Sequence, residues 1–232
     1  MDLSKTKSLL VVIEGFVVQI ATHWISLKHL PQRLVEFNPD LPWITVGMVS
    51  ATISPLVAIT YMCIRLQLIP KMITESKIFR SSAIGIILAW LVVFTQVLFL
   101  GKGDPFTLDI LQTRSQPAYF HLTLLLLVIW GPLLEEALNR GYFFETLRMN
   151  WGTAVALPIS SFLFVSFHGI FMTIYYGGIG YEMIFITLYS IIFTAVYMRG
   201  GLFAAFVTHM FVNSCLLYLN TETGIGGIRV TH

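Results

Sequence analysis

Acidic, basic, imidazole and amide side chains interrupt three of the long apolar runs in this chain. They are Glu135, Glu136 and Arg140 after HLTLLLLVIWG, His168 in FLFVSFHG, and His209 and Asn213 in VTHMFVNS. Carboxylates and imidazoles are the groups that transfer protons or bind metal ions in proteins. An ionised group is costly inside a bilayer, so a polar cluster of this kind indicates a functional site.

The spacing inside these runs places particular pairs on one face of a helix. Glu136 and Arg140 are four residues apart, which allows an ion pair between them. Glu135 points about 100° away from Glu136 and need not share that arginine, so it is left to face a cavity. His209 and Asn213 are also four residues apart and project together.

The depths of these residues in the membrane are similar. At 1.5 Å per residue, Glu135 lies roughly 20 Å from the inner end of its helix, His168 roughly 22 Å and His209 roughly 12 Å. With ordinary helix tilt these depths overlap within about two turns. The sequence therefore predicts a shared polar pocket in the inner half of the bilayer.

The composition is that of a membrane protein. Hydrophobic residues make up 56% of the chain and charged residues 11%, against about 25% charged in soluble domains. We expect an all-α, polytopic transmembrane helical bundle in contact with the lipid bilayer. The net charge of +2 gives no reason to expect a nucleic-acid partner.

About seven apolar runs have the length of ~20 residues that a bilayer requires. They cover roughly 8–27, 43–64, 81–101, 119–142, 153–175, 181–198 and 201–219. Pro, Gly and charged residues cluster between them, as in KHLPQRLVEFNPDLP and RGG. A single membrane domain over residues 1–232 is the simplest interpretation. The excess of Lys and Arg on the side of the N-terminus predicts that the N-terminus is cytoplasmic.

Taken one at a time, these polar residues have structural explanations. The Glu136–Arg140 pair by itself is typical of a clamp between helices, and Glu14 and His23 in the first run are expected to be packing residues. An intramembrane asparagine is usually a hydrogen-bonding contact between helices. The complete set on three helices exceeds what packing needs.

Three motifs in this set resemble those of one family. EEALNRGYFFETL fits an EExxxR motif, FVSFH an FxxxH motif and HMFVN an HxxxN motif. In order and spacing they are similar to the CPBP family, the CAAX proteases and bacteriocin-processing enzymes that are also called Abi proteins. The resemblance covers about residues 119–219, the four-helix catalytic core. One position departs: Asn139 stands where the family usually has a large apolar residue, which either adds a hydrogen bond near the site or marks a divergent subgroup.

The resemblance implies an intramembrane endopeptidase that uses a glutamate. Glu135 would be the general base that activates water, and His168 would help to hold and polarise that water. His209 and Asn213 would donate hydrogen bonds to the oxyanion of the tetrahedral intermediate. Fixed donors in a dry site stabilise such an oxyanion strongly.

The resemblance also assigns Glu136 and Arg140 a supporting role beside the catalytic carboxylate. It implies hydrolysis without a metal, so no cofactor is expected. Zinc remains the alternative, because two histidines and two glutamates can bind zinc and leave a position open for water. The chain has no HExxH motif, and these candidate ligands are spread over three helices.

The expected substrate is a membrane-associated peptide or protein. Prenylated CAAX proteins, bacteriocin or signalling peptides and C-terminal sorting tails all fit this description. A catalytically silent scaffold, a bacteriocin-immunity protein and a transporter are the alternative functions. The expected location is a prokaryotic cytoplasmic membrane.

Overall fold

A computed structural model describes residues 4–37, 42–66, 78–100, 115–178 and 180–222 of the chain, and these are almost entirely helical. The first three helices are α1 (Lys5–Phe37), α2 (Trp43–Leu66) and α3 (Ile78–Leu100). A composite helix follows, made of α5 (Pro117–Leu125), η2 (Leu126–Trp130), α6 (Gly131–Glu136), η3 (Ala137–Phe144) and α7 (Glu145–Trp151), where η marks π-helical segments. The last two helices are α8 (Thr153–Tyr176) and α9 (Glu182–Glu222).

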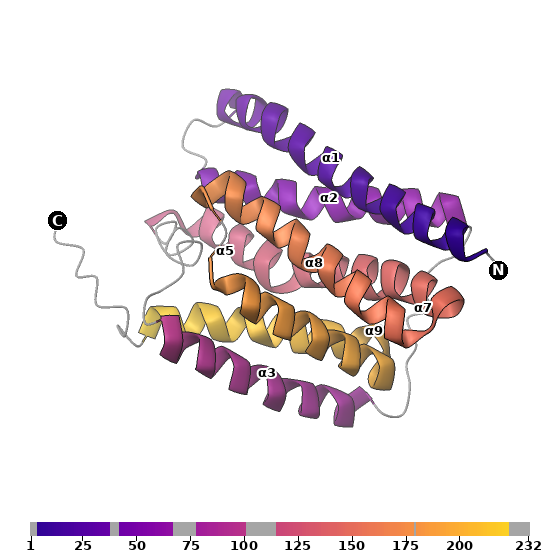
Figure 1. Cartoon of the computed structure of the whole chain (residues 1–232). Helices are drawn as coiled ribbons and strands as arrows, with labels where there is room; N and C mark the ends of the chain where they lie inside the picture. Colours follow the sequence, from indigo (N-terminus) through magenta and orange to yellow (C-terminus); the bar gives the residue numbers. More distant parts are fainter. Residues whose placement is uncertain (1–3, 38–41, 67–77, 101–114, 179, 223–232) are drawn as a thin grey trace.

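Six of the described helices are long and apolar enough to cross a membrane. The last of them, α9, is interrupted at Gly201, whose φ of 77° and ψ of −174° are not helical. A positive φ favours glycine because it has no Cβ. The chain reverses there, so residues 182–200 and 202–222 form two arms of α9 that run in opposite directions (Figure 1). The prediction of a polytopic all-α bundle of about seven membrane helices is therefore confirmed.

Two helices continue beyond the apolar runs that were predicted to span the membrane. Helix α1 continues to Phe37, through residues predicted to form a connection, and the composite helix continues to Trp151 and ends at Gly152 with a φ of 78°. Hydropathy marks where lipid ends, but Leu, Gln, Arg and Glu are good helix formers and continue a helix beyond it. Of the predicted connections at 65–80 and 101–117, residues 67–77 and 101–114 lie outside the described residues, and the orientation remains a prediction.

The composite helix lies inside the bundle. Figure 1 shows α1 and α2 on one side and α3 on the other, with the composite helix and α8 between them. Helix α1 packs along α2, and α3 packs along α9. The segment α6 to η3, which carries the EExxxR residues, contacts α2, α8 and α9. Its polar side chains are therefore surrounded by other helices instead of lipid.

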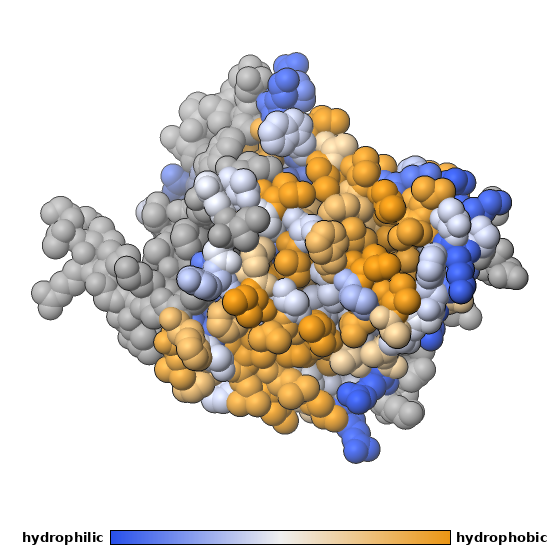
Figure 2. All heavy atoms as spheres, in the orientation of Figure 1, coloured by the Kyte–Doolittle hydropathy of each residue, from blue (hydrophilic) through white to orange (hydrophobic). Residues whose placement is uncertain are grey.

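The outer surface is that of an integral membrane protein. Figure 2 shows apolar side chains over the middle of the visible face, with most hydrophilic residues toward the ends of the helices. Large apolar side chains stand exposed on several helices, among them Trp24, Ile64, Leu98, Phe99, Phe162 and Phe203. Contact of such side chains with lipid tails costs no free energy, because the tails are as apolar as the side chains. Contact with water would be unfavourable.

We predict that Gly85→Val separates α3 from α9. A Cβ atom at Gly85 would lie 2.6 Å from both Thr208 Oγ1 and Val196 Cγ2, and both of these short branched side chains are buried. The variant should lose about 1–3 kcal/mol of unfolding free energy. This loss should appear as a lower thermal midpoint in detergent and less monodisperse protein. Gly178→Val is the control, because nothing lies within 4 Å of its Cβ position. Equal midpoints for the two variants would contradict the tight contact.

Candidate functional site

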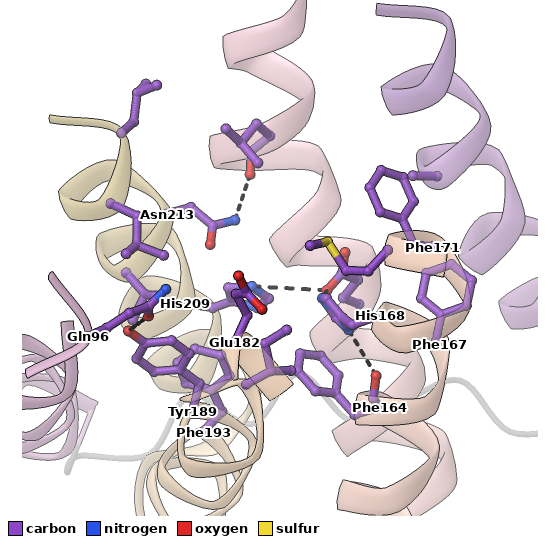
Figure 3. Close-up of a pocket in the computed structure, with 18 of the residues that line it drawn as sticks. Gln96, Phe164, Phe167, His168, Phe171, Glu182, Tyr189, Phe193, His209 and Asn213 are labelled. Carbon is purple, nitrogen blue, oxygen red and sulfur yellow. Dashed lines mark hydrogen bonds and ion pairs between the residues drawn. The ribbon is translucent and has the colours of Figure 1, made fainter. Parts of the chain in front are cut away.

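Three helices bring the predicted site residues to one cavity of about 190 Å³ (Figure 3). Glu135 comes from α6, His168 from α8, and His209 and Asn213 from the second arm of α9. The rest of the wall is mostly aromatic and aliphatic. It includes Met48 and Ala51 of α2 and Gln96 of α3. The cavity is thus built partly by helices outside residues 119–219, and the division of the chain into a core and other helices remains a prediction.

The Glu135 carboxylate faces both imidazoles without touching them. Its Oε2 atom is 3.7 Å from His168 Nε2 and 4.0 Å from His209 Nε2. Both distances exceed the usual length of a direct hydrogen bond. Glu135 Oε2 is buried and has no hydrogen-bond partner among the described residues. Three groups that can exchange protons therefore surround one small gap.

The other nitrogen of each imidazole identifies its tautomer. His168 Nδ1 is 2.8 Å from the carbonyl oxygen of Phe164. His209 Nδ1 is 2.9 Å from Glu136 Oε1. Carbonyl and carboxylate oxygens only accept hydrogen bonds, so each Nδ1 carries a proton and donates it. In a neutral ring the Nε2 atom is then an acceptor, and both lone pairs point toward Glu135.

Arg140 is the cation that compensates Glu136. Its NH1 group donates to Glu136 Oε1 at 3.0 Å, and both side chains are almost fully buried. Its NH2 group donates to the carbonyl oxygen of Ser190 at 3.0 Å and to the Ser190 hydroxyl at 3.1 Å. The guanidinium lies 4.5 Å from the ring centre of Phe164 and 5.4 Å from that of Phe193, distances typical of cation–π contacts. The predicted ion pair is therefore present, and it also connects α8 and α9.

Asn213 is held by a main-chain carbonyl that has no donor in its own helix. Its Nδ2 group donates to the Leu127 carbonyl at 2.9 Å. In the π-helical turn, the N–H of Gly131 is donated to Leu126 instead of Leu127. The next residue, Pro132, has no N–H. The Leu127 carbonyl thus needs a side-chain partner, and Asn213 supplies it.

Asn139, the departure from the family pattern, adds a hydrogen bond beside the site. Its Nδ2 group donates to the Glu135 carbonyl at 2.9 Å, and its side chain is buried in η3. π-Helical turns inside α-helices occur often at functional sites because they change the direction of side chains. Here such turns stand on both sides of the Glu135–Glu136 pair.

Glu14 and His23 do not line the cavity, which fits their predicted packing roles. Glu14 accepts hydrogen bonds from Tyr61 at 2.8 Å and Arg65 at 3.3 Å, at the α1–α2 contact. His23 is buried 3.3 Å from the Ser50 hydroxyl and packs against aromatic rings of α8. They stabilise the wall of helices around the site.

The sequence analysis missed several residues of the cavity. Tyr189 donates a hydrogen bond to Gln96 Oε1 at 2.7 Å, and both residues line the cavity together with Glu182. Two of the three had a signal in the sequence: Gln96 is an amide in an otherwise apolar run, and Glu182 is an acid at the start of one. Pro132 was the signal for the Asn213 contact, because a proline has no N–H and leaves the Leu127 carbonyl without a main-chain donor.

The fold and the site define a polytopic helical membrane protein with a carboxylate–imidazole site inside the bundle. Residues 117–215 match the family model described as type II CAAX prenyl endopeptidase Rce1-like, which belongs to the CPBP family. The family recognised from the three motifs is therefore confirmed over this part of the chain, and it is one of CAAX-type intramembrane proteases. Among curated proteins and solved structures, none matches the chain significantly.

We predict that Arg140→Ala unfolds the protein to a measurable extent. Glu136 would keep a buried carboxylate without its cation, at a cost of about 3–5 kcal/mol. Arg148→Ala is the matched control, because its pair with Glu145 is partly exposed and exposed pairs contribute about 0–1 kcal/mol. Thermal midpoints in detergent and the yield of monodisperse protein would show the difference. Similar losses in both variants would contradict a central role for Arg140.

Proposed function

We propose that this protein is an intramembrane endopeptidase that hydrolyses a peptide bond in a membrane-associated peptide or protein with water activated by Glu135. One observation carries the proposal. The unpartnered Glu135 Oε2 atom faces the Nε2 atoms of His168 and His209 across a gap in a cavity that Asn213 also lines. The family match to CAAX-type proteases supports the same reaction class.

A water molecule fits the hydrogen-bonding needs of this gap. Glu135 Oε2 and the Nε2 atom of neutral His168 are both acceptors, and 3.7 Å separates them. Two acceptors that face each other need a donor between them, and water provides two O–H groups. One O–H would point to Glu135 and the other to His168. The water oxygen is then free to attack a carbonyl carbon.

The reaction follows from these positions. Glu135 takes a proton from the water as the water oxygen bonds to the scissile carbonyl carbon. The carbonyl oxygen becomes an oxyanion, and Glu135 then returns the proton to the amine nitrogen as the C–N bond breaks. Asn213 gives one N–H to Leu127 and has a second for the oxyanion. His209 donates from Nε2 when its ring carries a second proton. One such donor is typically worth about 3 kcal/mol.

Glu136 and Arg140 act through the residues around them in this proposal. Glu136 Oε1 binds both Arg140 and the Nδ1 atom of His209, and so it orients the ring that faces the oxyanion. We propose that no metal takes part. Among the described residues, no group of three or more His, Cys, Asp or Glu is arranged to hold a metal ion. The zinc-dependent alternative is decided by the metal experiment below.

Glu135→Gln should remove the base while keeping the shape of the side chain. Proteolysis should fall by about 10²–10⁴-fold, while folding is retained. The measurement is cleavage of a peptide library by purified protein in detergent, followed by mass spectrometry. Glu14→Gln is the control, since Glu14 lies outside the cavity. Full activity in Glu135→Gln would disprove the assignment, and a library cut by neither wild type nor variant would favour the scaffold alternative.

Removal of metal should leave activity unchanged. Protein treated exhaustively with a chelator should cleave peptides at the untreated rate, and elemental analysis should find well under one zinc per chain. The physical reason is that Glu135 and His168 alone can activate the water. Stoichiometric zinc, with activity lost on its removal and restored on its return, would support the zinc-dependent alternative.

A further inference from the structure

A second carboxylate shares the cavity with Glu135. Glu182 is the first residue of α9, and it lines the same cavity from the side of the first arm. Figure 3 draws it together with the other residues that line this cavity. The proposed hydrolysis uses Glu135 and leaves Glu182 without a role.

One oxygen of the Glu182 carboxylate has no partner in the described part of the chain. The residue is half-buried, and its Oε2 atom is buried and makes no hydrogen bond there. It folds back over Gly180, where any Cβ atom would overlap with it. A buried carboxylate oxygen without a partner is costly. An incoming group that supplies a positive charge would therefore gain binding free energy.

A helix-capping role does not account for this side chain. An acid at the start of a helix commonly binds main-chain N–H groups or benefits from the helix dipole. In this helix the N–H of Met183 is donated to the Gly180 carbonyl and that of Ile184 to the Tyr181 carbonyl. The main chain itself thus uses these donors, so the carboxylate does not cap them, although the helix dipole still favours its negative charge.

The described wall of the cavity contains no lysine or arginine. The nearest cation in the site, Arg140, is committed to Glu136 and Ser190 and is enclosed by two aromatic rings. Glu135 and Glu182 are therefore the two acids of a cavity whose other polar groups are imidazoles, amides and a hydroxyl. A positive side chain is complementary to this charge, and a negative one is not.

We infer that Glu182 is a specificity determinant that binds a lysine or arginine side chain of a peptide substrate that occupies this cavity. The inference rests on the proposed peptidase function and names the substrate class of the same site. The cationic group pairs with Glu182 while the aliphatic part of that side chain packs against the apolar wall. Glu135 stays unpaired and keeps its role as base.

The test uses sets of fluorogenic peptides in which one position, scanned over the residues on either side of the cleaved bond, is Lys, Met or Glu. In at least one set, wild-type protein in detergent should cleave the Lys peptide with a kcat/KM at least about tenfold above that of the Met peptide. Glu182→Gln should bring the two within about twofold by lowering only the Lys value. Glu182→Lys should reverse the order in favour of the Glu peptide, and Glu182→Asp should retain the Lys preference. Glu14→Gln is the control and should behave as wild type.

Each result has a definite meaning. A wild-type Lys-to-Met ratio near one in every set overturns the inference, whether or not the variants fold. An equal loss on all peptides in well-folded Glu182→Gln also overturns it, because that loss indicates a structural role. Cleavage that requires Glu135 but ignores the charge of the substrate rejects this inference and leaves the proposed function standing. If no peptide is cut above the level of Glu135→Gln, the proposed function fails and this inference fails with it.

Discussion

The ion pair between Glu136 and Arg140 is the constraint on which the rest of the site depends. Both side chains are almost completely buried at the centre of a membrane bundle. A charge in that position must be matched in charge and in hydrogen bonds. Arg140 meets the requirement through Glu136 and through the carbonyl and hydroxyl oxygens of Ser190. The first arm of α9 must therefore lie against the composite helix.

The position of the reactive groups follows from this arrangement. Glu136 Oε1 also accepts from His209, so the second arm of α9 is brought to the same point. The guanidinium of Arg140 is then engaged by Glu136 and Ser190, and Glu135 is left without a cation of its own. One glutamate is neutralised and holds the helices together, while its neighbour faces a cavity with two imidazoles. Adjacent residues of the same type thus have opposite environments because they point to different sides of one helix.

The sequence predicted the features that depend on one helix at a time. The number of membrane helices follows from the ~20 apolar residues that a bilayer requires, and the Glu136–Arg140 pair follows from its spacing. The contacts of Arg140 with Ser190, and the roles of Gln96 and Glu182 in the wall, depend on which helices touch. Hydropathy carries no information on that choice. The hydrogen bond from Asn213 to the Leu127 carbonyl depends on a π-helical turn. The spacing of apolar residues along the sequence does not reveal such a turn.

The four-residue spacing of Glu136 and Arg140 also matters while the chain is being synthesised and inserted into the membrane. His209 leaves the ribosome about 70 residues after Arg140, roughly 4 to 14 s later. Ser190 follows Arg140 by 50 residues, so neither Ser190 nor His209 is in the membrane when Arg140 enters it. A lone charge in hydrocarbon would oppose insertion of the helix that carries it. Because Glu136 lies one turn before Arg140 on the same helix, the two charges already neutralise each other as the helix enters the bilayer, and the later helices find a paired cluster on which to assemble.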